Sequence, residues 1–433
     1  MQPSESAAAD APIDGPSLVA TALYLYLLQG LNFLIPLLSV AYLVRILGPQ
    51  IYGLIAFAQA FVAYALVVTD YGFPLTAARD VSVSRANPSD LARIFWTTMM
   101  TKLLLLTVCL VVVGLVVGFV PDLRKDWRIF AACSMALIGN LAFPIWYLQG
   151  IERLPRAALI LLLSRCVLTA SVFVFVRSPS DSLAAALLMS TPLLVGGLGA
   201  LLFQRTCYPL EFYRPSFLDV RNCLAEGWHI FAGSVSTTLY LQTNAFVLGI
   251  LVDKQAVAYF SVAYSIVLAV QGLSIPATQS AYPRISLLFS TSPALAWRLT
   301  RKLALTILPM MAIASVLLAV FTKPLIQFTA GMQYMASISV VRVMAALPFL
   351  ISAAAILGPC VMVNVNLSRQ LMWVYIAIGA INVLLLPHLV RSYAATGAAT
   401  ALVIAEFLGP VAMLCSLWVN RSRLPGRAFQ APT

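Results

Sequence analysis

Long apolar runs alternate with short polar connections along almost the whole chain. A helix needs about 20 apolar residues to cross roughly 30 Å of hydrocarbon, and about twelve runs reach that length. We expect spans near residues 18–47, 51–78, 91–120, 128–149, 154–176, 181–204, 223–252, 255–283, 295–321, 334–363, 370–392 and 395–419. Lipid offers no partners for backbone polar groups, so each span is predicted to be helical. The pattern therefore predicts an all-α integral membrane protein.

The longest polar stretch lies close to the middle of the chain, between Arg205 and Gly227. It divides the predicted spans into two halves of six helices each. The predicted organisation is a polar tail (1–17), a first bundle (18–204), a linker (205–222), a second bundle (223–419) and a second tail (420–433). The first tail lacks the basic start and short apolar core of a signal peptide, so we expect the first span to be retained.

The two halves align as an internal repeat when the second is shifted by about 205 residues, as in transporters built from two matching halves. The shift pairs Gln50 with Gln255, Ala58 with Ala263, Arg79 with Arg284 and Arg93 with Arg298. It also overlays the turns at residues 47–50 and 252–255. A parallel repeat of six helices predicts a transport site in a central cavity between the halves.

Composition changes this picture in two ways. Charged residues make up only 10% of the chain, and Lys and Arg exceed Asp and Glu to give a net charge of +12. About sixteen Lys and Arg residues fall on the side that the termini share and about eight on the other, so both termini are predicted to be cytoplasmic. The excess is thus attributed to membrane topology and not to a nucleic-acid partner. Seven Cys without a CxxC pair and only two His favour neither a metal site nor a redox cofactor.

Four segments carry recognisable motifs: ILGPQIYG at 46–53, DYGFP at 70–74 followed by Arg79-Asp80, PIWYLQGIE at 144–152, and GAATA at 397–401 with Glu406. Together they resemble the Wzx-type O-antigen and polysaccharide flippases of the multidrug/oligosaccharidyl-lipid/polysaccharide (MOP) exporter superfamily. The resemblance covers nearly the whole chain, and its most specific motif comprises Trp146, Gln149, Gly150 and Glu152. It implies a twelve-helix fold, a polyprenyl-diphosphate-linked glycan as cargo, and a polysaccharide polymerase and a chain-length regulator as partners.

The motifs also allow a physical interpretation. Gly72 and Pro74 interrupt a helix near its cytoplasmic end, which suits a gate or hinge or a simple kink. Asp70 is either an interfacial helix end or a titratable group in the cavity. Trp146 and its neighbour Tyr147 fit an aromatic belt at a helix end, with sugar stacking as the alternative. Gly150 is expected to close its helix as a left-handed cap.

Cations inside the spans are the strongest functional signal. Arg165 lies near the centre of its span, where insertion of Arg costs at least about 2.5–3.5 kcal/mol unless it faces protein or water. Lys102 and Arg342 are shallower, so each could reach the interface or line the cavity. Acidic residues inside the spans are too few to neutralise them, since only Glu406 is deep and Asp70 is marginal. A cavity with surplus positive charge favours an anionic cargo.

Two further arginines and two carboxylates complete the predicted site. Arg79 and Arg284 are paired by the repeat at the cytoplasmic mouth, where they could meet a diphosphate or merely follow the positive-inside rule. Glu406 and Asp70 are candidates for ion coupling, because the chain lacks an ATP-binding loop of the GxxxxGK[ST] kind. Amide side chains in the spans either contact sugar or satisfy a neighbouring helix, and these are Asn32, Gln59, Asn140, Gln242, Asn244 and Asn364.

The favoured function is a flippase that works by alternating access. A multidrug exporter of the same superfamily moves cations and should carry a net acidic cavity, so it is the second choice. A membrane enzyme such as a polysaccharide polymerase needs a sizeable loop with paired catalytic groups, and no such loop is evident.

Overall fold

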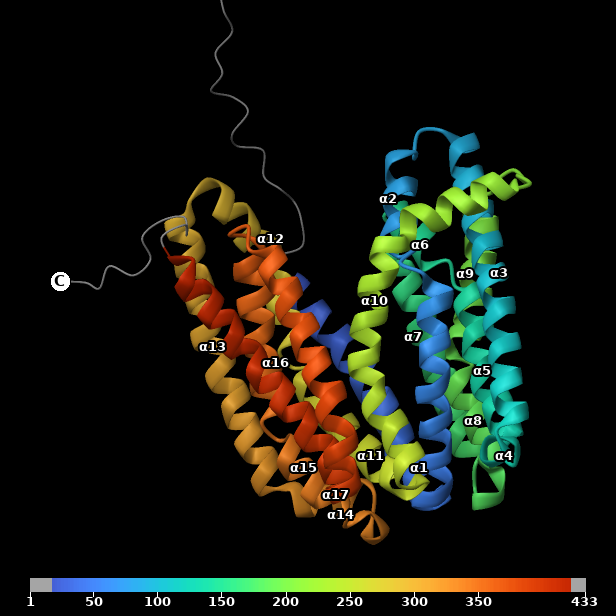
Figure 1. Cartoon of the computed structure of the whole chain (residues 1–433). Helices are drawn as coiled ribbons and strands as arrows, with labels where there is room; N and C mark the ends of the chain where they lie inside the picture. The colour runs from blue at the N-terminus through green and yellow to red at the C-terminus, as the bar shows by residue number, and fades with distance from the viewer. Residues whose placement is uncertain (1–17, 422–433) are drawn as a thin grey trace, which may run out of the picture.

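A computed structural model describes residues 18–421, without the side chains of residues 18–29, 32–33 and 232–241. The predicted tail at 1–17 and the part of the second tail after residue 421 lie outside this range, as does the side chain of Asn32. The described residues are helical and contain no strand (Figure 1). The first half contains α1 (Leu18–Asp70), α2 (Thr76–Val83), α3 (Pro88–Phe119), α4 (Pro121–Arg124), α5 (Trp127–Ala142), α6 (Ile145–Gly150), α7 (Leu154–Phe175), α8 (Ser182–Ser190) and α9 (Pro192–Cys207).

The second half begins with α10 (Phe217–Leu251) and contains α11 (Lys254–Gln271), α12 (Ile275–Thr291), α13 (Pro293–Val320), α14 (Thr322–Thr329), α15 (Ser337–Met344), α16 (Leu347–Ala355) and α17 (Ser368–Val419). Among the described residues, eight helical stretches are long and apolar enough to cross a membrane, and nine if the bent pair α11–α12 counts as one span. Both α1 and α17 contain a break, at Gly48 and Ala394. If the two parts of each are counted separately and α10 is added, the architecture has about twelve crossings, as the pattern predicts.

Helix boundaries depart from the predicted spans where backbone chemistry decides them. The second crossing ends at Asp70 and not near residue 78, because Tyr71 and Gly72 adopt positive φ angles of 44° and 81° that a helix cannot contain. The seventh crossing begins at Phe217, earlier than the predicted 223. Ser216 and Asp219 cap each other's backbone there, which starts the helix before the apolar run.

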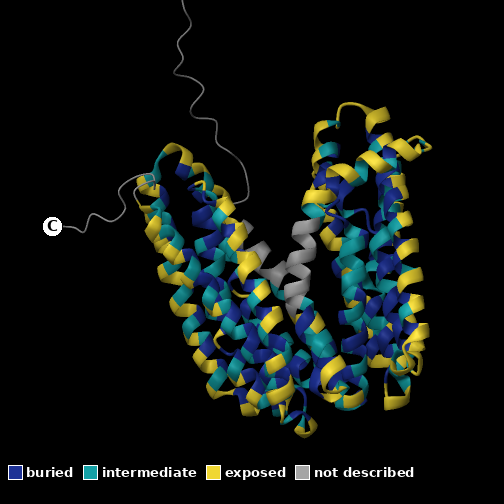
Figure 2. Ribbon diagram, viewed as in Figure 1, coloured by how far each residue is buried: buried dark blue, intermediate teal, exposed yellow. Residues whose placement is uncertain are grey.

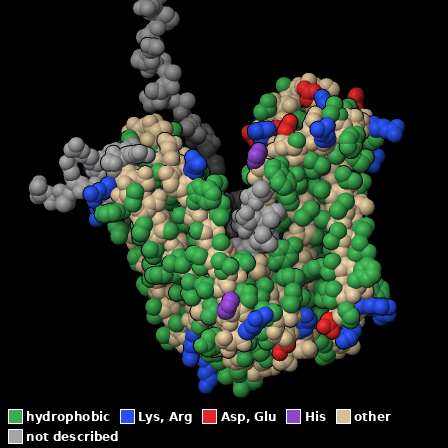
Figure 3. All heavy atoms as spheres, in the orientation of Figure 1, with side chains coloured by type: hydrophobic (Ala, Val, Ile, Leu, Met, Phe, Trp, Pro, Cys, Tyr) green, Lys and Arg blue, Asp and Glu red, His purple; other side chains and the backbone are tan. Residues whose placement is uncertain are grey.

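The helices form two bundles that meet at one end and diverge at the other (Figure 1). Helices α1 and α10 lie between the bundles, with α1 packed on α5 and α11, and α10 packed on α1 and α17. We call the end that carries α2, α6 and α12 the open end, and the end that carries α4, α14 and the Gly48 break the closed end. The space-filling view shows a notch between the bundles that widens toward the open end (Figure 3).

The outer surface is that of a membrane protein. Exposed residues follow the outer sides of the bundles, while buried residues lie between helices (Figure 2). Large apolar side chains such as Leu103, Val111 and Leu115 on α3 are about half exposed, which would be costly in water and is favourable against lipid. Lys, Arg, Asp and Glu gather near the two ends of the molecule (Figure 3). This distribution matches a bilayer crossed by the middle of both bundles.

Candidate functional site

A cavity with a volume of about 550 Å³ lies in the described part of the chain. Its walls come mainly from α1, α5, α7, α8 and α9 of the first bundle, and α11 adds Ser265 and Leu268 from the second. The cavity therefore lies mostly inside the first bundle, at its border with α11. The sequence predicted a cavity placed more evenly between the halves.

Arg165 on α7 lines this cavity and is half-buried. The other described lining residues are apolar or neutral and polar, and they include no Asp or Glu. Gln59 contributes an amide to the wall, and the Ser39 hydroxyl donates to Thr169 Oγ1 at 3.0 Å. A guanidinium on the wall of a largely apolar chamber attracts an anion, because charges interact more strongly in apolar surroundings and Arg offers planar donors.

Lys102 does not line this cavity. It is buried on α3, where Nζ donates to Asn140 Oδ1 at 2.5 Å and to the Asn140 carbonyl at 3.0 Å. Asp70, at the end of α1, forms an ion pair with the same ammonium at 3.4 Å. The expectation that Lys102 lacks an acidic partner is therefore wrong. Asn140, which is half-buried on α5, is likewise engaged by Lys102.

The remaining predicted cations lie apart from Arg165. Arg79 on α2 and Arg284 on α12 are exposed near the open end, on opposite bundles. Arg79 Nη2 is 2.9 Å from Asp80 Oδ1, so its charge is already shared with a neighbour. Arg342 on α15 is exposed on the second bundle. The structure thus leaves Arg165 as the predicted cation that reaches the cavity.

Glu406 is half-buried on the second part of α17. It is close enough to Tyr264 of α11 and Tyr375 of the first part of α17 to act on both hydroxyl groups electrostatically. A carboxylate surrounded by phenols within a helical bundle can exchange a proton or bind a cation. Its position in the second bundle separates it from the Arg165 cavity in the first.

The turn that contains Gly72 and Pro74 joins α1 to α2 and packs against α10. A Cβ atom at Gly72 would lie 2.6 Å from Ile230 Cγ2, and φ at this residue is 81°, so glycine is required on both counts. The Tyr71 ring stacks on Phe231 with centroids 4.5 Å apart. The turn therefore connects the end of α1 to α10, the helix that runs between the bundles.

The motif at 144–152 differs from its predicted role. Trp146 and Tyr147 are 0% and 1% exposed, so they form core contacts with Phe95 and not an aromatic belt. Gly150 is not a left-handed cap: the positive φ of 59° belongs to Glu152. A Cβ atom at Gly150 would lie 2.5 Å from Val81 Cγ1, so this glycine lets α6 approach α2 closely.

Arg85 joins the ends of this motif. Its Nε donates to the Gly150 carbonyl at 2.6 Å, and its Nη1 pairs with Glu152 at 2.8 Å. Gln149 is exposed on the same short helix. The motif therefore fastens α6 to the α2 region at the open end, with Trp146 and Gly150 in packing contacts and Glu152 in the ion pair.

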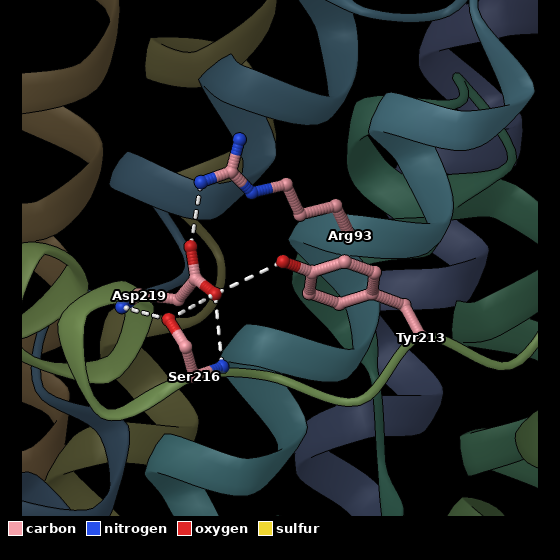
Figure 4. A network of polar contacts seen from close by, with 4 residues as sticks. All are labelled: Arg93, Tyr213, Ser216 and Asp219. Carbon is pink, nitrogen blue, oxygen red and sulfur yellow. Dashed lines mark hydrogen bonds and ion pairs between the residues drawn. The ribbon is translucent and has the colours of Figure 1, made fainter.

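A polar network at the start of α10 was missed by the sequence analysis (Figure 4). Arg93 Nη2 is 2.5 Å from Asp219 Oδ1, and Asp219 Oδ2 accepts from the Tyr213 hydroxyl and from the Ser216 backbone N–H and hydroxyl. Arg93, followed by the Ser216 donors, holds the pKa of Asp219 far below its usual range. The capping-box spacing of Ser216 and Asp219 is a local signal that could have revealed it. The network fixes the start of α10 to α3.

Solved structures with the same fold are found among exporters. One is a multidrug resistance MATE family transporter of the MOP superfamily in an inward-facing conformation, with a TM-score of 0.66, 13% identity, and coverage of 96% of this chain and 100% of that one. Another is the lipid II flippase MurJ in an inward closed conformation, with a TM-score of 0.67, 13% identity, and coverage of 93% and 87%. At these identities the likeness shows a shared fold.

Closer relatives are found among curated sequences. The chain is 32% identical over 409 residues to "Putative O-antigen transporter" of Escherichia coli (strain K12), covering 94% of this chain and 98% of that protein. It is 26% identical over 404 residues to the protein of the same name from Shigella dysenteriae, covering 90% and 98%. The family described as polysaccharide biosynthesis protein matches residues 18–289. The chain therefore belongs to the polysaccharide biosynthesis protein family and has the fold of the MOP exporters.

Proposed function

We propose that the protein is a flippase of the bacterial inner membrane. Its cargo is a polyprenyl-diphosphate-linked oligosaccharide repeat unit, which moves from the cytoplasmic to the periplasmic leaflet to supply O-antigen, capsule or exopolysaccharide synthesis. A polysaccharide polymerase and a chain-length regulator are the partners that would use the product. The transporter names of the relatives and the family match support this assignment.

The Arg165 cavity is the observation that carries the proposal. A diphosphate brings negative charge, and Arg offers planar, bidentate donors to phosphate oxygens. The described lining contains Arg165 and no carboxylate, so the chamber suits an anion and disfavours the cationic cargo of a multidrug exporter. Arg79 and Arg284, on opposite bundles at the open end, provide a first contact for the diphosphate as it enters.

The transport cycle follows from the two bundles. Both termini are cytoplasmic in this proposal, so the open end faces the cytoplasm and the closed end the periplasm. Rocking of the bundles about α1 and α10 then exposes the cavity to each side in turn, with the turn at Gly72 and Pro74 as a hinge. An ion gradient drives the cycle through Glu406. Asp70, the other candidate, is already engaged by Lys102, so its role is secondary.

Complementation of a strain that lacks its own flippase tests the proposal. Arg165→Ala should abolish surface polysaccharide while the protein still inserts into the membrane, and Arg165→Lys should keep part of the activity because it keeps the charge. Arg128→Ala, which removes an exposed arginine at the start of α5, is the matched control and should export normally. Normal polysaccharide from the Arg165→Ala variant would remove the cavity from the mechanism.

A further inference from the structure

The closed end contains contacts that sequence patterns do not reveal. Arg45, just before the break in α1, reaches the second bundle, and Gln333, just after α14, reaches the first. The stretch of α1 around Arg45 belongs with the first bundle, because Ser39 donates to Thr169 on α7 and Tyr42 donates to the Val176 carbonyl at its end. The two contacts therefore cross from one bundle to the other.

Gln333 supplies hydrogen bonds that the break in α1 removes. In an uninterrupted helix the carbonyl of Arg45 would accept from the N–H of residue 49, but Pro49 has no N–H. Gly48 leaves the helix with φ 72° and ψ 171°. Gln333 Nε2 donates to the Arg45 carbonyl at 3.1 Å and to the Val44 carbonyl at 3.0 Å. A side chain of one bundle thus satisfies acceptors exposed by the other.

Arg45 makes the reciprocal contact with the end of α14. The last carbonyls of a helix have no partner within it and carry partial negative charge. Arg45 Nε donates to the Thr329 carbonyl at 3.2 Å, and its Nη2 contacts the carbonyls of Phe328 and, at 3.5 Å, Gln327. One guanidinium therefore caps three successive carbonyls of the opposite bundle.

We propose that Arg45 and Gln333 form a latch that holds the two bundles together at the closed end. Both side chains are exposed at the rim, so water can replace their hydrogen bonds when the bundles separate. The latch therefore sets the fraction of protein molecules that are closed at this end, whichever cargo is carried.

Distances between spin labels at the open end test the latch in purified protein without substrate. The labels go on Val83→Cys of α2 and Leu287→Cys of α12, which are 81% and 63% exposed, in a background with the seven native Cys replaced. Loss of the latch lets the closed end open and draws the labelled end together. Arg45→Ala should raise the ratio of short to long distances about tenfold, the effect expected for losing a charge-assisted hydrogen bond.

One further variant and a control make the outcome decisive. Gln333→Glu keeps the shape of the side chain but removes its donors, so it should shift the distances in the same direction as Arg45→Ala. Arg124→Ala removes an exposed arginine of α4 at the same end and should leave the distances unchanged. Distance distributions of Arg45→Ala and Gln333→Glu that superimpose on the parent would overturn the latch. An equal shift in Arg124→Ala would also overturn it, because the effect would then be one of charge at this end in general.

Discussion

The open and closed ends of the molecule use the same residue type, arginine, with different partners. At the open end arginines pair with carboxylates of the first bundle and the start of α10, in the pairs Arg79–Asp80, Arg85–Glu152 and Arg93–Asp219 at 2.9, 2.8 and 2.5 Å. At the closed end Arg45 caps carbonyls of the opposite bundle. Two of these carboxylate pairs lie within the first bundle and the third joins it to α10, whereas the carbonyl partners of Arg45 lie across the boundary between the bundles.

Close packing differs between the ends in the same way. At the closed end a Cβ atom at Gly53 of α1 would lie 1.7 Å from the Lys254 carbonyl of α11, and one at Gly249 would lie 2.2 Å from the Phe57 ring. At the open end the close glycine contacts join α6 to α2, within the first bundle, and the Gly72 turn to α10. A contact between two bundles that move apart is favoured by a close fit and by polar groups that water can reach when the contact opens. A permanent contact can use an ion pair, because its partners never separate.

The largest effect is expected at the closed end, where α1 and α11 leave no space for an added methyl group. Gly53→Ala places a methyl group against the Lys254 backbone, which cannot yield as a flexible side chain can, and should destabilise the closed contact by about 3 kcal/mol. Surface polysaccharide in the complementation assay should fall at least tenfold. Gly114→Ala on α3, where a Cβ atom meets nothing within 4 Å, is the matched control. Equal export by both variants would show that α1 and α11 need not approach this closely.

A smaller loss is expected from the buried ion pair in the first bundle. Asp70→Asn leaves the Lys102 ammonium buried without a carboxylate, and we expect a loss of about 2–3 kcal/mol in the free energy of unfolding, at or below the range for buried pairs. Lys102→Met should cost less, because the Asp70 side chain is 41% exposed and can be hydrated. Thermal unfolding of both variants in detergent measures the order. The reverse order would mean that Lys102 is stabilised chiefly by Asn140.

The Arg93–Asp219 network should give a loss of about 1–2 kcal/mol when Asp219→Asn removes its charge. Because the folded pKa of Asp219 is depressed, its contribution is present above the usual Asp pKa of about 3.9 and is lost as the pH falls through the lower folded value. The stability of Asp219→Asn should therefore depend less on pH below about 4 than that of the parent. Asp122→Asn, at an 88% exposed carboxylate of α4, should match the parent at every pH.

Hydropathy predicts the crossings well because every crossing must span the same bilayer thickness and must satisfy its backbone hydrogen bonds within a helix. The ends of the crossings are less predictable, since Tyr71 and Gly72 end a helix inside an apolar run and Ser216 starts one inside a polar run. These boundaries depend on dihedral angles and side-chain caps, to which average hydropathy is insensitive.

The residues of the site could be predicted where a residue's depth in the membrane alone determines its surroundings. Arg165 is too deep to reach an interface, so its place in a cavity follows from its position in the span. The partner of Lys102 does not follow, because pairing with Asp70 depends on how α1 and α3 are rotated against each other. Arg45 lies inside the predicted span 18–47, and Pro49 four residues later marks a carbonyl that needs an outside donor.

The smallest effect is expected at the exposed pair of the open end. Glu152→Gln removes a carboxylate that is 75% exposed, and a surface pair of this kind contributes about 0.5 kcal/mol or less. Arg85→Ala should cost more, because it also removes the hydrogen bond to the Gly150 carbonyl. Thermal unfolding at low and at high salt separates the two terms: the small loss in Glu152→Gln should vanish when salt screens the pair, and the larger loss in Arg85→Ala should persist. If salt abolished both losses, the open end would depend on charge alone and its contrast with the carbonyl contacts of the closed end would be stronger.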